Sequence, residues 1–212
     1  MRRTRADNKE ATLERIRQAA VDLFAAHDYD EVTMGAVARG AGISDATLFR
    51  YVEAKLDLLT LAYGDQFDEL LSSIDEADAR RLLAADALTG ALQRDRILAI
   101  YEQRCEFYLR HPVNGALYLA QGFNERNPAR ARNIAQGDRT IRLVGAIIED
   151  GQQAGQLLAS VVARDVAQNC HGIYMHEIQR TAVRGFSPET IWPRVRARLL
   201  AQLDPLVPDQ IG

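Results

Sequence analysis

The sequence predicts an all-α fold, and three observations support that prediction. Apolar residues recur at helical spacing, and between residues 11 and 26 they form one stripe: Leu13, Ile16, Ala20, Leu23 and Phe24. Runs in which apolar and polar residues alternate, as in a half-buried strand, are missing. The six prolines and fourteen glycines are scattered along the chain. We therefore expect helices joined by short turns, with no internal repeat.

The composition is that of an ordinary globular protein. Of its 212 residues, 47% are hydrophobic and 26% are charged. No apolar run reaches the length of a membrane span, and no apolar segment follows the basic N-terminus, so we expect neither a membrane helix nor a secretory signal. Cys105 and Cys170 are too few for a disulfide framework, which favours a cytoplasmic protein. The net charge of −3 argues against a general nucleic-acid coat but permits a local binding patch.

The first 55 residues predict three helices. The first spans residues 8–27 and ends in the turn sequence HDYDE. Thr33 is a good N-cap for a second helix, and Gly42 suits a left-handed cap at that helix's end. Ser44 then caps a third helix, in which Leu48 and Val52 face inward because they are four residues apart.

Two short helices joined by a glycine turn form a helix-turn-helix when the second helix carries outward polar side chains. Such a helix fits the major groove of B-DNA. We expect phosphate contacts from Thr33, Tyr51 and Lys55, and base contacts from Ser44, Thr47 and Arg50. Asp45 either accepts a hydrogen bond from a cytosine or only stabilises the first turn of the helix. The alternative is an ordinary helical corner with solvated charges.

Residues 10–61 resemble the N-terminal domain of the tetracycline-repressor (TetR) family. The resemblance rests on the AA…LF pair of the first helix, Tyr29, Thr33, Val37-Ala38, the AGIS turn, Thr47-Leu48, the aromatic residues on either side of Arg50, and Lys55. Phe49 stands where the family generally has tyrosine, so a phosphate contact from that hydroxyl is lost. The resemblance implies a DNA-binding domain over residues 1–54 and a larger helical domain for ligand binding and dimerisation over 55–212.

An N-terminal arm contains Arg2, Arg3 and Arg5. It either enters an adjacent minor groove, where narrow A·T tracts attract arginine, or forms a solubilising tail. Residues 1–55 carry nine basic and nine acidic side chains. This balance predicts few phosphate contacts per subunit, so two such domains would be needed for tight binding.

Further helices are expected over residues 54–77, 92–110, 113–126, 130–154, 160–184 and 188–204. The last two resemble the dimerising pair of the family, and their apolar stripes are Val162, Val166 and Ile173, then Trp192, Val195, Leu199 and Leu203. These stripes form either the core of one chain or half of an intermolecular four-helix bundle. Pro193 implies that the last helix bends there or begins near Trp192.

The middle helices would enclose a ligand cavity in the family. Residues suited to line it are Phe67, Tyr101, Cys105, Tyr108, Tyr118, Phe123 and Tyr174. An aromatic stripe at helical spacing is, alternatively, simple core packing. His171 and His176 are five residues apart and so diverge on a helix, which disfavours a metal site. No catalytic motif accompanies Cys105 or Cys170, so we expect no enzyme activity and no cofactor.

These observations lead to one hypothesis and one alternative. The hypothesis is a homodimeric, sequence-specific transcriptional regulator, a repressor that a small apolar or aromatic ligand releases from a palindromic operator in double-stranded DNA. The alternative is a helical ligand-binding or interaction protein without a functional operator.

Overall fold

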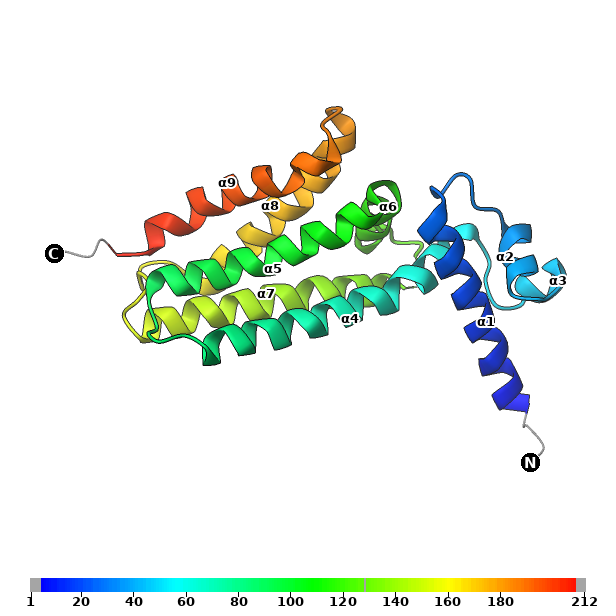
Figure 1. The fold of residues 1–212 in the computed structure, drawn as a ribbon, viewed down its shortest axis with the longest axis horizontal. Helices are drawn as coiled ribbons and strands as arrows, with labels where there is room; N and C mark the ends of the chain where they lie inside the picture. The colour runs from blue at the N-terminus through cyan, green and yellow to red at the C-terminus, as the bar shows by residue number, and fades with distance from the viewer. Residues whose placement is uncertain (1–4, 128, 209–212) are drawn as a thin grey trace. The chain divides into compact units, whose positions relative to one another are not determined.

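The computed structural model describes residues 5–127 and 129–208, and within these ranges it contains helices and turns but no strand (Figure 1). The α-helices are α1 (Arg5–Ala26), α2 (Met34–Gly40), α3 (Asp45–Leu48), α4 (Lys55–Leu83), α5 (Gly90–Arg110), α6 (Pro112–Ala120), α7 (Arg130–Gln153), α8 (Ala163–Val183) and α9 (Ile191–Leu203). Three short 3-10 segments are η1 (Gln121–Phe123), η2 (Pro188–Thr190) and η3 (Asp204–Leu206). The predicted all-α fold is confirmed. In the described parts of the chain, every helix is too short or too polar to cross a membrane.

The chain divides into two compact units, each formed by two segments of the sequence. The first unit contains the residues up to Phe67 together with His111–Asn133. The second contains Asp68–Arg110 and the residues from Ile134 onward. The division therefore falls inside α4, whereas the sequence placed it at the start of that helix. Because α6 belongs to the first unit, it forms one body with the helix-turn-helix.

In the core of the first unit, α1 packs on α2, and α2 packs on α3. Ile16, Phe24, Val37 and Leu48 are fully buried there. Asn114 of α6 is also buried, and its Nδ2 donates hydrogen bonds to the carbonyl oxygens of Phe24 (3.0 Å) and His27 (2.9 Å). It thereby satisfies carbonyl groups at the end of α1 that have no partner within that helix.

The second unit combines an apolar core with buried ion pairs. Arg96 of α5 binds both carboxylate oxygens of Asp78 on α4, at 2.8 and 2.7 Å. Glu177 of α8 is fully buried and accepts hydrogen bonds from Arg180 and Arg194. Burial alone would raise the pKa of Glu177, but these hydrogen bonds and the charge of Arg198 outweigh it and lower the pKa. The carboxylate thus stays ionised and ties α8 to α9.

Among the helix boundaries that differ from the sequence prediction, two have a clear physical reason. The helix predicted to end near residue 77 continues to Leu83, because the segment EADARRLL has good helix formers and no proline or glycine. The last helix begins at Ile191, which makes Pro193 its third residue. A proline there costs no helical hydrogen bond, since the first N–H groups of a helix lack partners within it.

Candidate DNA-binding site

The turn between α2 and α3 is built by local hydrogen bonds that the sequence predicted. Thr33 caps α2 by accepting a hydrogen bond from the Ala36 amide, and Ser44 caps α3 by accepting one from Thr47. Gly42 has φ +65°, a left-handed conformation that favours glycine. The amide of Gly42 donates to the Arg39 carbonyl and that of Ile43 to the Ala38 carbonyl, which is the Schellman arrangement.

The helix α3 is only four residues long, but its turn continues beyond it. The amides of Arg50 and Tyr51 donate to carbonyls three residues earlier, at 3.1 and 2.9 Å. Leu48 and Val52 are buried, as predicted, and fix this segment against the core. The polar side chains consequently point away from the core. The segment can present them to a groove without unfolding.

The predicted DNA-contact residues lie on this segment and at its edges. Exposed members are Thr33, Ser44, Asp45, Phe49 and Arg50, and partly exposed members are Thr47, Tyr51 and Lys55. The Ser44 and Thr47 hydroxyls are 2.9 Å apart and share a hydrogen bond, so each retains capacity for one further partner. Phe49 is 55% exposed, an unusual position for an apolar ring unless something covers it. Their roles toward DNA stay predictions.

Lys55 has a contact within the chain that the sequence did not predict. Its Nζ donates to the Tyr29 carbonyl at 2.7 Å and lies 4.2 Å from the centre of the Tyr29 ring. That ring stacks on Phe24 of α1, with ring centroids 6.1 Å apart. The turn between α1 and α2 is therefore held against the start of α4. The Lys55 ammonium can still donate to a phosphate, because only part of its hydrogen-bonding capacity is used.

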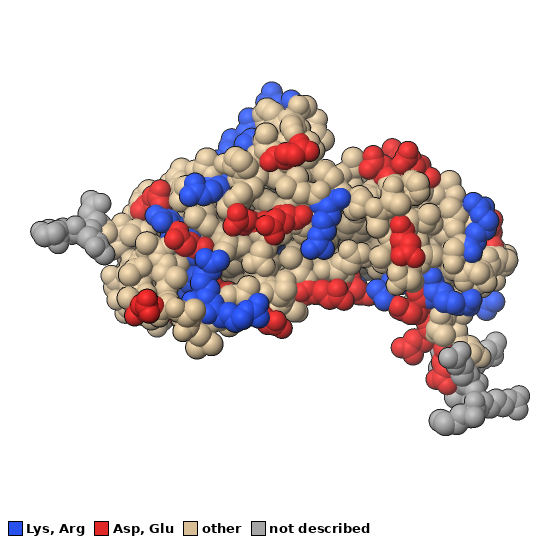
Figure 2. Space-filling view, in the orientation of Figure 1, with Lys and Arg blue, Asp and Glu red and all other residues tan. Residues whose placement is uncertain are grey.

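The charge around the site is mixed. On the face shown in Figure 2, basic and acidic side chains are interspersed over both units, so this face carries no continuous basic surface. This agrees with the net charge of −3 and with recognition through a local patch. Of the proposed arm, Arg2 and Arg3 lie outside the described residues, and α1 begins at Arg5, which therefore belongs to the helix.

The residues predicted for dimerisation divide into two groups. Four are buried within the single chain: Val166, Val195, Leu199 and Leu203. This burial within one chain is what the intramolecular alternative expects, and a contact of these residues with a partner stays a prediction. Val162 is 62% exposed, and Ile173 and Trp192 are partly exposed. Of the seven predicted residues, these three are accessible to a second copy.

The residues predicted to bind ligand also fall into two groups, one in each unit. In the first unit, Phe67 and Tyr118 pack together with ring centroids 5.9 Å apart, whereas Phe123 is 71% exposed. In the second unit, four are buried: Tyr101, Cys105, Tyr108 and Tyr174. Burial raises the pKa of Cys105 to about 12, so its thiol is neutral. The exposure of Phe123 follows from its place in η1, beyond the packed turns of α6.

Sequence reasoning missed two polar residues of the second unit's interior. Arg104, three residues after Tyr101, is 1% exposed, and His171 precedes Tyr174 by one turn. The position of Arg104 in the sequence could have indicated its burial, because it lies at helical spacing from Tyr101 and Tyr108, on the aromatic face of α5.

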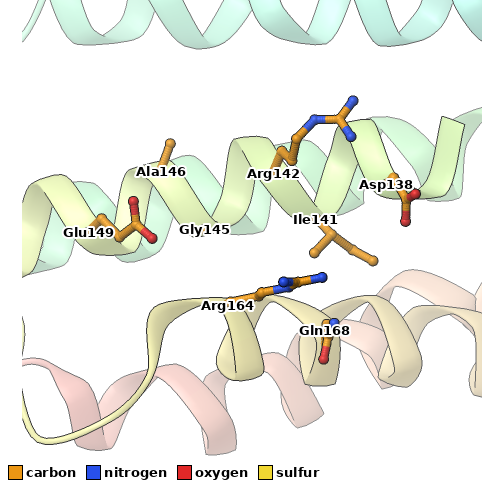
Figure 3. Close-up of a pocket in the computed structure, with 8 residues that line it drawn as sticks. All are labelled: Asp138, Ile141, Arg142, Gly145, Ala146, Glu149, Arg164 and Gln168. Carbon is orange, nitrogen blue, oxygen red and sulfur yellow. The ribbon is translucent and has the colours of Figure 1, made fainter. Parts of the chain in front are cut away.

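A groove of about 440 Å³ lies on the second unit between α7 and α8. Figure 3 shows that Asp138, Ile141, Arg142, Gly145, Ala146 and Glu149 line it from α7, and Arg164 and Gln168 from α8. Ile141 and Arg164 point into the space between the helices. Within the described chain, the four charged side chains form no ion pair. The groove thus offers both signs of charge to a partner.

Comparison with known proteins places these features in a family. Residues 16–61 match the family model described as bacterial regulatory proteins, tetR family. A Mycobacterium tuberculosis protein, provisionally named as the mycofactocin biosynthesis transcriptional regulator MftR, is 36% identical over 84 residues. This match covers 40% of the present chain and 42% of the relative, so it spans less than half of that protein's length.

Solved structures resemble the chain over almost its full length. A TetR transcription regulator from Haloarcula marismortui has a TM-score of 0.69 at 16% identity, covering 94% of this chain and all of that one. Bacillus subtilis FadR in complex with stearoyl-CoA gives 0.64 at 15% identity, with 91% and 98% covered. Thermus thermophilus FadR in complex with lauroyl-CoA gives 0.64 at 22%, with 94% and 98% covered. At these identities the likeness concerns the fold.

The fold and the site together define a helix-turn-helix protein with a large helical remainder. The family match falls on the helix-turn-helix itself, and the likeness in fold extends over both units. The helix-turn-helix segment is thus similar to that of bacterial regulatory proteins of the tetR family, and the whole chain is similar in fold to a TetR transcription regulator.

Proposed function

We propose that the chain is a homodimeric regulator of transcription that binds a two-fold symmetric operator in double-stranded DNA and responds to a small ligand. The observation that carries the proposal is the capped helix-turn-helix, in which Ser44, Gly42 and the buried Leu48 fix a short helix with Arg50 facing outward. An α-helix of this kind fits the major groove, where arginine recognises guanine.

The contacts with DNA follow from where the side chains lie. Arg50 is exposed, so it is free to reach a base edge. Thr33, Tyr51 and Lys55 border the segment and would bind phosphates, which fixes the register on the duplex. Asp45 would repel phosphates; it either accepts a hydrogen bond from a base amino group, such as that of cytosine, or only stabilises the first turn of α3. Ser44 and Thr47 would contact bases through their hydroxyl groups, which are hydrogen-bonded to each other.

Dimerisation follows from the requirement for two half-sites. Two α3 segments must enter successive major grooves, about 34 Å apart, to read a palindrome. The exposed side of α8 is the surface we assign to the partner: Val162, Gly172, Ile173 and Val183, together with the charged groove of Figure 3. Opposite charges without internal ion pairs suit a two-fold interface, in which each copy supplies both signs.

The effector is proposed to be a small molecule with an apolar or aromatic body. The buried aromatic side chains of the second unit support this, and two proteins of the same fold contain acyl-CoA molecules, stearoyl-CoA and lauroyl-CoA. A ligand that favours a conformation unable to span both half-sites would release DNA, and DNA would weaken ligand binding by the same free energy. Repression would result from occupation of a promoter.

The test is a gel-shift assay on the DNA that flanks the coding sequence. We expect the parent protein to retard a palindromic fragment as a dimer. Arg50→Ala should bind with a weaker preference for that sequence, by about 1–3 kcal/mol, whereas Arg81→Ala, an exposed arginine near the end of α4, should behave like the parent. Equal binding by the parent and Arg50→Ala would contradict the assigned role. Failure of the parent to bind any fragment would favour the alternative, a helical ligand-binding or interaction protein.

Lys55→Ala requires a second measurement. It should weaken binding to all sequences about equally if Lys55 binds phosphate. It also removes the contact with the Tyr29 carbonyl, so it could act by loosening the turn. Urea unfolding of the same variant separates the two causes, because only a structural defect lowers the unfolding midpoint.

A further inference from the structure

The interior of the second unit contains a polar cluster among aromatic rings. Tyr101 and Arg104 of α5 and Tyr174 of α8 are each 1% exposed or less. The guanidinium of Arg104 stacks on the Tyr174 ring, 4.6 Å from its centre, and donates a hydrogen bond to the Thr140 hydroxyl. The ring of His171 lies 6.3 Å from that of Tyr174, and the ring of Tyr101 lies 5.8 Å from it.

Within the described chain, neither Oη of Tyr101 nor Nδ1 of His171 has a hydrogen-bond partner. Leaving a buried polar atom unsatisfied costs about 1–3 kcal/mol, and folded proteins retain few such atoms. Both atoms are buried, and both belong to rings that neighbour Tyr174. Unsatisfied polar groups next to the Arg104 guanidinium destabilise the ligand-free chain. Proteins retain such destabilising groups mainly at functional sites.

The protonation states define what the cluster can bind. Burial, assisted by the charge of Arg104, lowers the pKa of His171 to about 3, so the imidazole is neutral at neutral pH. Burial raises the pKa of Tyr101 well above its usual value, so the phenol keeps its proton. The cluster consequently offers an O–H donor, one imidazole N–H and a guanidinium cation. Its net charge is positive, which suits an anion.

We propose that this cluster binds the carboxylate of a small organic acid, whose apolar or aromatic body lies among the neighbouring rings. Tyr101 and His171 each donate a hydrogen bond to the carboxylate, and the Arg104 guanidinium contributes a positive charge beside them. The proposal rests on the proposed function, because it names the chemical class of the effector. A carboxylate effector differs from a CoA thioester, because the acyl carbonyl of a thioester is uncharged.

The competing explanation is that a buried water molecule satisfies Tyr101 and His171, and that the cluster is only structural. The two explanations predict opposite results for Tyr101→Phe. A hydroxyl that is satisfied by water stabilises the ligand-free protein, so its removal should lower the melting temperature. A hydroxyl that has no hydrogen-bond partner until a ligand binds destabilises the ligand-free protein. Its removal should therefore leave the melting temperature unchanged or raise it, while ligand binding is lost.

The experiment measures melting temperature and calorimetric affinity for the full-length protein. The probes are trans-cinnamate and octanoate, each paired with its uncharged amide, and lauroyl-CoA. We expect at least one acid to bind and its amide to bind at least tenfold more weakly. Tyr101→Phe should reduce the affinity for the acid at least tenfold without lowering the melting temperature of the ligand-free protein. Tyr29→Phe, the same substitution in the first unit, should bind the acid like the parent.

Several results would overturn the proposal: no binding of either acid, equal binding of acid and amide, binding of lauroyl-CoA alone, or unchanged affinity in Tyr101→Phe. A lower melting temperature in that variant with unchanged affinity would assign the hydroxyl to water. A gel shift without ligand, on the same preparations, keeps the two proposals apart. A protein that binds its operator but no acid refutes this inference alone, whereas one that binds acid but no DNA refutes only the proposed function.

Discussion

The buried imidazole of His171 makes the stability of the protein depend on pH. Its pKa is lowered to about 3 in the folded chain, whereas an ordinary histidine titrates near 6.5. Below pH 6.5 the unfolded chain therefore takes up a proton that the folded chain does not. The contribution of neutral His171 to the free energy of unfolding is fully present above pH 6.5 and is lost as the pH falls toward 3.

This titration predicts that the free energy of unfolding falls by about 2 kcal/mol between pH 7 and pH 5 through His171 alone. Urea unfolding of the parent and of His171→Leu at several pH values measures it. The variant should lack this part of the pH dependence, because leucine does not titrate. Glu177, whose pKa is lowered, changes the free energy of unfolding only at lower pH. Parallel profiles for the two proteins would show that His171 titrates normally.

Individual side chains were predictable from the sequence where their partners are close along the chain. The caps Thr33 and Ser44 bond to amides three residues later, and Gly42 follows its helix directly, so a short window contains the whole signal. Lys55 and Arg104 were not predictable in this way. Their partners Tyr29 and Thr140 are 26 and 36 residues away, and only the fold brings them together.

Among the helices, α6 is joined to α1 by one buried side chain. Asn114 donates two hydrogen bonds to the carbonyls of Phe24 and His27, in the same unit as the helix-turn-helix. Asn114→Ala should destabilise the protein by about 1–3 kcal/mol, because it leaves two acceptors at the end of α1 without a donor. Hydrogen exchange should increase most in the last turn of α1 and in the following turn.

A matched substitution tests whether the hydrogen bonds cause this effect. Asn124→Ala, in the loop after η1, removes an amide of the same kind that bonds locally to Gln121. It should leave exchange in α1 unchanged. If Asn114→Ala leaves the end of α1 equally protected, the two hydrogen bonds contribute nothing measurable to that helix end.

The type and order of the helices could be read from periodicity, but the limits of some helices and of the units could not. Helix α4 runs to Leu83 because nothing in its sequence stops it, and the sequence offers no signal for the division near Phe67. The division depends on contacts of α6, which lies more than 40 residues farther along the chain. Similarly, the stripes on α8 and α9 have the same pattern whether they pack within one chain or between two.

For the molecule as a whole, the proposed dimer is expected to form through the exposed side of α8. Val162 and Val183, at the two ends of this helix, are 62% and 82% exposed. Gly172 lies between them, and a Cβ built on it would meet no atom of the chain within 4 Å. Arg164 and Gln168, which line the groove in Figure 3, precede Gly172 at four-residue intervals and so lie on the same side of α8. A partner that packs on this side would cover Gly172 closely.

Gly172→Trp should therefore separate the dimer without harming the fold of one chain. Gly172 is exposed and a Cβ there meets no atom of the chain, so the indole can project into solvent, but a partner helix that packs against a glycine cannot accommodate it. We expect the variant to sediment as a monomer with parental helix content, and to bind a palindromic operator far more weakly than the parent. Gly172→Ala is the control: it should remain dimeric and gain about 0.5–1 kcal/mol of stability, because alanine favours the helix. If Gly172→Trp remains a dimer with parental affinity for DNA, the interface lies on another surface and the assignment of α8 to the partner is wrong.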